Sequence, residues 1–135
     1  MRFAETYLLR AEARLRQNNT AGAADDINVL RDRAFKDARV TSNNPELGRV
    51  SAGDINIDFI LDERARELIA EENRRMTLVR TGKLKDRIAL NGDTGPTGKV
   101  ITGFQDYNAL LPIPLNDILL NNKQSESLTQ NPGYK

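Results

Sequence analysis

Adjacent acidic residues are the first candidates for chemistry in this chain. Asp25-Asp26 and Glu71-Glu72 are neighbouring carboxylates, and glycoside hydrolysis uses a pair of carboxylates that face each other across a cleft. Adjacent residues of a helix point about 100° apart, so neither pair converges on one substrate atom. We therefore expect both pairs to lie on solvated helix surface, and an acid-base hydrolase is disfavoured.

Residues 92–99 resemble a phosphate-binding loop. Asp93, however, stands where the first glycine of that loop is needed, and Val100 replaces the Ser or Thr that would hold magnesium. We expect an ordinary surface loop.

Residues 54–58 copy the first five places of a calcium-binding loop. Phe59 then occupies the place of the turn glycine, and Ala65 that of the bidentate glutamate. Helix capping is the expected use of these acids, so no metal site is predicted.

The inventory of side chains excludes most catalytic classes. The 135 residues contain no His, Cys or Trp, which rules out a Ser-His-Asp triad, a thiol nucleophile, a disulfide framework and a conventional zinc site. Lys and Arg number 20 and Asp and Glu 19, so the charge balance gives no reason to expect nucleic acid as a partner. We expect no catalytic residue and no cofactor.

The length predicts one domain or a piece of a larger one. The hydrophobic fraction is 39%, below the usual ~45–50% (a figure that includes Gly). This indicates a thin core, or one shared with residues outside the chain. The N-terminus has no apolar signal-peptide region, and no stretch approaches the ~18 apolar residues of a membrane span.

Hydrophobic periodicity predicts that the chain opens with a helical hairpin over residues 1–35. Two helices are expected, at 3–17 and 21–35, with Thr20 as N-cap of the second. A connection of about three residues requires them to pack antiparallel, as in a tetratricopeptide repeat. Their expected buried positions are Phe3, Tyr7, Ala11, Leu15, Ala23, Ile27, Leu30 and Ala34.

A long third helix is predicted over residues 54–82, after a loop at 36–53. It starts near Asp54 or Asp58, and Gly82 is placed to end it. The charges on both sides of Leu68 are open to two interpretations, an exposed face or a partly buried bidentate network. The expected apolar stripe consists of Leu61, Ala65, Leu68, Ile69, Met76 and Val79.

Residues 83–135 are expected to form a loop-rich closing segment. Two prolines in the apolar run 110–114 exclude a central strand or a helix interior, so this run is predicted to be extended. Pro114 is suited to the first position of a short helix at 115–120.

Four motifs together cover nearly the whole chain. They are Phe3–Ala13, Ile27–Ala34, Ile60–Leu68, and Leu110–Pro114 followed by Asn131–Tyr134. In this order they resemble the C-terminal part of the SusD/RagB family. The third motif has the family's Ile-Leu-x-Glu-Arg-x-x-Glu-Leu pattern and continues through Glu71, Arg74, Leu78, Arg80 and Gly82-Lys83.

The resemblance implies a non-enzymatic, all-α component of nutrient uptake. It implies a lipid-anchored protein on the outer face of the outer membrane, which works with a SusC-type TonB-dependent transporter. The implied ligand is an oligosaccharide, in some members a peptide. The chain departs from the family where Glu71-Glu72-Asn73-Arg74 replaces Glu-Gly-His/Lys-Arg, and Thr77 replaces an Asp that often precedes Leu78.

The composition limits how much of a ligand site this chain can hold. Family glycan sites rely on aromatic platforms, and this chain has no Trp. We expect a C-terminal fragment, with the lipid-anchored cysteine and most of the ligand site outside it. Phe104 and Tyr107, with the loop around them, are the candidate ligand-binding residues. The alternative is a helical-repeat scaffold that binds proteins and no small molecule.

Overall fold

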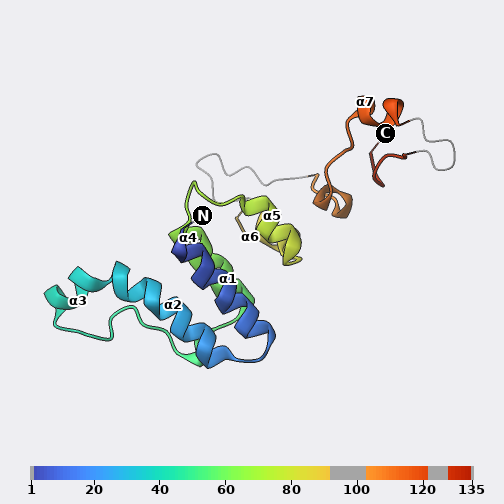
Figure 1. Ribbon diagram of the computed structural model, residues 1–135. Coiled ribbons are helices and arrows are strands. Elements are labelled where there is room, and N and C mark those ends of the chain that lie inside the picture. Colours follow the sequence, from blue (N-terminus) through green and yellow to red (C-terminus); the bar gives the residue numbers. More distant parts are fainter. Residues whose placement is uncertain (1, 92–102, 122–127, 135) are drawn as a thin grey trace. The chain divides into compact units, whose positions relative to one another are not determined.

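The computed structural model describes residues 2–91, 103–121 and 128–134 (Figure 1). In these ranges the chain forms seven α-helices, two short 3-10 helices and no strand, which confirms the predicted all-α class. None of the described helices is both long and apolar enough to cross a bilayer. The chain divides into two compact units, Met1–Glu72 and Asn73–Lys135, and each is described by itself.

Helices α1 (Phe3–Arg16) and α2 (Thr20–Ala34) form the antiparallel hairpin of the first unit (Figure 1). Asn19, one residue before the predicted cap, accepts the Gly22 N–H at 2.9 Å and so caps α2. Ala11 and Ala23 are completely buried, and their small side chains let the two backbones approach closely. Phe3, expected in the core, is exposed.

Helix α4 (Ile57–Glu67) packs on α1 and completes the core of this unit. Its cap is Asn56, which accepts the Phe59 N–H at 2.9 Å. The buried face differs from the predicted stripe. Glu63 and Arg64 occupy buried positions of α4. Ala65 and Ile69, which were expected in the core, are exposed.

The single long helix predicted over 54–82 is wrong. Helix α4 ends at Glu67, and α5 (Arg74–Arg80) begins after a turn in which Ala70 has a φ of +62°. In an unbroken helix Glu72 would lie about 12 Å along the axis from Arg64. The break brings the Glu72 carboxylate to 2.6 Å from the Arg64 guanidinium.

The predicted loop at 36–53 contains a helix, α3 (Lys36–Ser42), and a 3-10 turn, η1 (Ala52–Asp54). Asp32 anchors this segment at two points, because its carboxylate binds Arg39 of α3 at 2.7 Å and Arg49 at 2.9 Å. Hydrogen bonds from these two guanidinium groups lower the pKa of Asp32 to about 2. Long-range ion pairs supply the order that local hydrophobic periodicity does not predict.

The second unit is built from short elements. Gly82, with a φ of +70°, lies just beyond α5, and the Lys83 N–H donates to the Leu78 carbonyl at 2.8 Å, which confirms the predicted helix end. A helix that the sequence did not predict follows, and the predicted helix at 115–120 is confirmed. The remaining elements are α6 (Leu84–Asn91), η2 (Asp106–Ala109) and α7 (Leu115–Leu120).

The observed burial predicts different costs for truncating Ile60, within α4, and Ile69, in the turn after it. Ile60 is 0% exposed and Ile69 is 78% exposed. Ile60→Ala removes fully buried methylene groups and is expected to lower the free energy of unfolding by about 2–5 kcal/mol. Ile69→Ala is the matched control, with an expected change within about 0.5 kcal/mol. Urea denaturation measures both, and equal costs would contradict the observed difference in burial.

Candidate functional site

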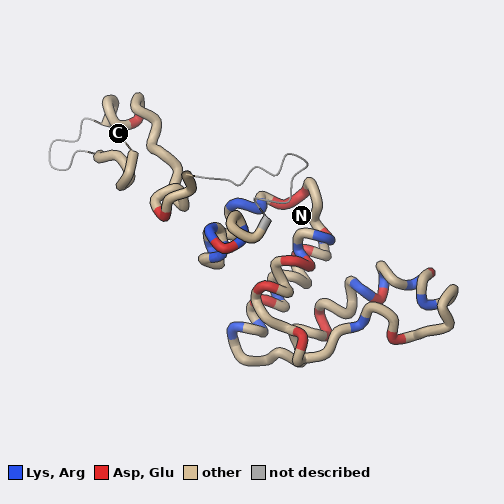
Figure 2. Tube along the Cα trace, turned by 180° about the vertical axis from the view of Figure 1, so that it is seen from behind, with Lys and Arg blue, Asp and Glu red and all other residues tan. Residues whose placement is uncertain are grey.

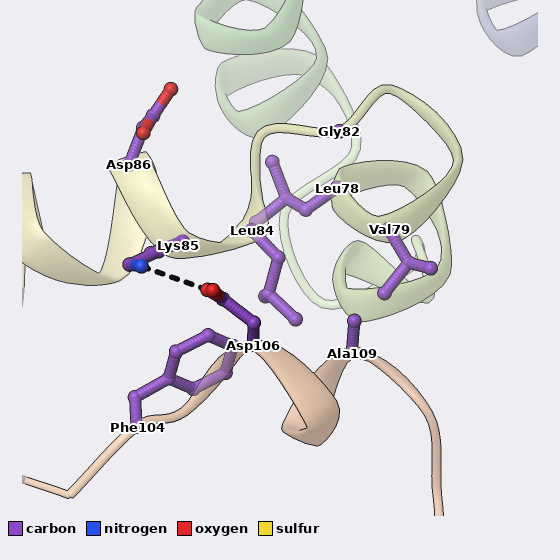
Figure 3. Close-up of a pocket in the computed structure, with 9 residues that line it drawn as sticks. All are labelled: Leu78, Val79, Gly82, Leu84, Lys85, Asp86, Phe104, Asp106 and Ala109. Atoms are coloured by element: carbon purple, nitrogen blue, oxygen red, sulfur yellow. Dashed lines mark hydrogen bonds and ion pairs between the residues drawn. The ribbon is translucent and has the colours of Figure 1, made fainter. Parts of the chain in front are cut away.

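A pocket of about 270 Å³ opens in the second unit and is the best candidate for a ligand site (Figure 3). Its walls are apolar on the side of α5 and α6, and charged side chains stand at its rim. Phe104 faces it from the segment that leads into η2 (Figure 3). The walls and rim consist of Leu78, Val79, Gly82, Leu84, Lys85, Asp86, Phe104, Asp106 and Ala109.

Two tight local structures position the pocket walls. The turn at Gly82 folds α6 back on α5, so that Leu78 and Leu84 become buried side by side. On the opposite wall, the Asn108 side chain accepts the Gln105 N–H at 2.7 Å and caps η2. This cap fixes Asp106 at the first position of η2.

An ion pair spans the rim between the two walls. The Lys85 ammonium donates to the Asp106 carboxylate at 2.8 Å (Figure 3). This hydrogen bond, together with the charge of Asp106, raises the pKa of Lys85. The side chains are 65% and 82% exposed, and such pairs contribute little stability. They do place a strong donor and a strong acceptor side by side, next to an apolar wall and an aromatic ring.

The two residues predicted from the sequence have different environments. Phe104 is half-buried and lines the pocket. Tyr107 is not among the lining residues, and its ring packs edge-on against Tyr134, with centroids 5.2 Å apart. The sequence analysis missed Lys85 and Asp106. The only signal in the sequence was that these residues carry opposite charges before and after residues 91–103. Helix and strand periodicity cannot pair two residues that are 21 positions apart.

The C-terminal residues clamp the segment that follows Tyr107. Gln130 makes two hydrogen bonds to the backbone of Ile113, accepting its N–H at 2.7 Å and donating to its carbonyl at 2.9 Å. The Tyr134 hydroxyl donates to the Leu110 carbonyl at 2.9 Å. Gln130 and Tyr134 therefore satisfy backbone groups of the extended, proline-containing run 110–114.

A second hollow, of about 450 Å³, adjoins α5 on a more apolar surface. Met76 and Leu111 contribute exposed apolar surface to it. Arg75, which also lines it, donates to the backbone carbonyl of Asn108. A donor and acceptor pair like that of Lys85 and Asp106 is not found among its described lining residues, so the first pocket is the better candidate for a polar ligand.

Two of the four acids that were expected on solvated helix surface, Asp26 and Glu72, have buried side chains. Asp26 accepts hydrogen bonds from Arg10, the shortest at 2.6 Å, and lies 3.0 Å from Arg14. Glu72 lies against buried Arg64, whereas Glu71 binds Arg2 at 2.6 Å on the surface. The error has a physical cause, because arginines from other helices compensate the desolvation of Asp26 and Glu72.

The polar residues of the calcium-loop imitation make local capping contacts. Asp54 accepts hydrogen bonds from the backbone and hydroxyl of Ser51, and Asn56 caps α4. A cluster of three or more potential metal ligands is not found in the residues that the structure describes. Residues 92–99, the phosphate-loop imitation, fall outside the described ranges.

Comparison with known proteins identifies the family. Residues 1–134 match the SusD family, and the chain belongs to it. It is 34% identical over 134 residues to "SusD-like protein P25" of Formosa agariphila. It is also 34% identical over 142 residues to "Starch-binding protein SusD" of Bacteroides thetaiotaomicron.

Both matches take in 99% of this chain, but only 24% and 21% of the respective relatives. The chain thus spans about a quarter to a fifth of the length of the curated relatives it matches. No solved structure gives a significant match.

The C-terminal clamp predicts a specific requirement for Gly133. This residue has a φ of +87°, and a Cβ atom built there would overlap the Tyr107 ring. Gly133→Ala is expected to lower the free energy of unfolding by about 1–3 kcal/mol and to weaken the near-ultraviolet circular dichroism of the Tyr107–Tyr134 pair.

Gly103→Ala is the matched control, since its φ is +93° but a Cβ atom would have open space. It carries the backbone strain without the overlap. An unchanged tyrosine signal in Gly133→Ala would contradict the described contact.

Proposed function

We propose that this chain is the C-terminal portion of a nutrient-binding component whose ligand is a carbohydrate. The parent protein is held at the outer face of the outer membrane by a lipid anchor outside this chain. It delivers its ligand to a SusC-type TonB-dependent transporter and performs no catalysis.

One observation carries this proposal. The similarity to a protein described as starch-binding extends over 99% of the chain, at 34% identity. The pocket beside Phe104 supports a carbohydrate in particular. An aromatic ring beside paired polar groups can contact both the apolar face and the hydroxyl groups of a sugar.

The environment of the acids supports a binding protein rather than an enzyme. Burial raises the pKa of Glu63, but hydrogen bonds from Arg31 and Arg66 outweigh it and keep the pKa below its usual range. A carboxyl group held ionised in this way is a poor general acid near neutral pH.

A single aromatic ring at the pocket implies weak binding by this chain alone. Phe104 is the aromatic residue that lines it among the described residues, and the platforms of a complete site would come from the rest of the parent protein. An affinity of about 1 mM or weaker is therefore expected, which corresponds to about 4 kcal/mol.

A protein-interaction scaffold is the second candidate, and exposed leucines favour it. The closing segment leaves large apolar side chains in solvent, and these are Leu110, Leu111, Leu115, Leu119 and Leu120. Apolar surface of this kind is typical of protein interfaces.

Nuclear magnetic resonance titration of the 135-residue chain with a panel of neutral oligosaccharides separates the candidates. The proposal predicts saturable chemical-shift changes with a dissociation constant of about 1 mM or weaker. Phe104→Ala is expected to weaken binding about fivefold, since one aromatic contact contributes about 1 kcal/mol.

Leu119→Ala, on α7, is the control and should bind normally. Binding much tighter than 1 mM would contradict the fragment interpretation. Capture of a SusC-type transporter without any oligosaccharide response would support the scaffold and overturn the carbohydrate proposal.

A further inference from the structure

We propose that the pocket beside Phe104 is a subsite for a single uncharged sugar ring, and that Lys85 and Asp106 set its preference for neutral over acidic sugars. This inference rests on the proposed carbohydrate function and assigns it a location and a ligand charge.

The dimensions of the pocket fit one ring. Its volume of about 270 Å³ falls below the ~300–1,000 Å³ of sites that enclose drug-sized ligands. A pyranose unit, or the last unit of a longer chain, can enter it. Several linked sugars cannot, so the pocket is a subsite rather than a complete oligosaccharide site.

The chemistry of the lining matches the two kinds of surface on a sugar ring. Val79 and Leu84 offer aliphatic surface, and the Phe104 ring lies at the same opening (Figure 3). These groups can cover the C–H face of a pyranose. At the rim, the Lys85 ammonium can donate to one hydroxyl oxygen while the Asp106 carboxylate accepts from the neighbouring hydroxyl group.

The charges at the rim favour a neutral ligand. The charged side chains that line the pocket are Lys85, Asp86 and Asp106, and Asp86 lies 3.8 Å from the ammonium group of Lys83. The cation is already engaged by Asp106 at 2.8 Å. A sugar carboxylate would have to displace Asp106 from Lys85 and then lie close to the Asp106 carboxylate, whereas a hydroxyl group can join the pair without separating it.

The test uses two ligands that differ only at one carbon. Methyl glucoside and methyl glucuronide share the same ring, and only the glucuronide carries a carboxylate. Each is titrated into the isotope-labelled 135-residue chain, and shifts are followed at the methyl groups of Leu78 and Leu84 and at the Phe104 ring. We expect the glucoside to shift these signals in the millimolar range and to bind at least about fivefold more tightly than the glucuronide.

Asp106→Asn tests the role of the ion pair. The substitution removes one negative charge and frees Lys85, so the glucoside should bind about fivefold more weakly and the glucuronide more tightly, which reverses the preference. Asp117→Asn makes the same chemical change at an exposed position of α7 outside the pocket and should leave both affinities unchanged. Thermal melts of the two variants confirm that each is folded.

Three results would overturn the inference. They are equal binding of the two ligands by the wild-type chain, an unchanged preference in Asp106→Asn, and glucoside-induced shifts confined to residues outside the pocket. The third result leaves the proposed carbohydrate function intact and refutes only this location. Absence of any response to the glucoside and to every neutral oligosaccharide would refute both.

Discussion

Buried ion pairs are the constraint on which the first unit depends. Arg64 is a large side chain only 2% exposed, and the Glu72 carboxylate beside it is 5% exposed. Removing a guanidinium group from water is costly unless a carboxylate and further hydrogen bonds compensate it. The chain supplies the carboxylate by ending α4 at Glu67 and returning Glu72 to Arg64. The break between α4 and α5 thus allows Arg64 to be buried next to an opposite charge.

Similar pairs join the other helices of this unit. Asp26 of α2 receives two arginines of α1, Arg10 and Arg14. Glu63 of α4 forms a bidentate pair with Arg31 of α2, at 2.8 and 3.1 Å, and the Arg31 guanidinium also lies over the Phe59 ring. Acidic and basic residues are interspersed along these helices (Figure 2). The near-zero net charge of the chain thus coexists with several ion pairs that join one helix to another.

The sequence predicts the features of this chain that depend on local chemistry. The hairpin, the helix end at Gly82 and the short helix after Pro114 follow from periodicity, from a residue with positive φ and from a proline, and the structure confirms them. The register of α4 and the helix break depend on Arg64 and Glu72. Periodicity counts such residues as polar and assigns them to the surface. The possibility of a buried network around Leu68 was the correct alternative.

The candidate site is also only partly predictable from the sequence. An aromatic residue in a polar loop can be recognised there, and Phe104, which is half-buried, lines the pocket. Lys85 and Asp106 come from elements on the two sides of residues 91–103, so only the folded chain brings them together. Tyr107 has the same residue type as a ligand platform, but its ring packs against Tyr134. The small pocket with its polar rim supports the proposed recognition of a ligand.

A double-mutant cycle on Arg64 and Glu72 tests the central claim most directly. Arg64→Met and Glu72→Met each leave a buried charge without this partner, and each should lower the free energy of unfolding by about 3–5 kcal/mol. The double variant leaves neither charge, so its cost should fall short of the sum of the single costs by at least about 1 kcal/mol. Single costs that add up to the cost of the double variant within about 0.5 kcal/mol would show that the pair does not hold the turn at Glu72 against α4. That result would contradict this account.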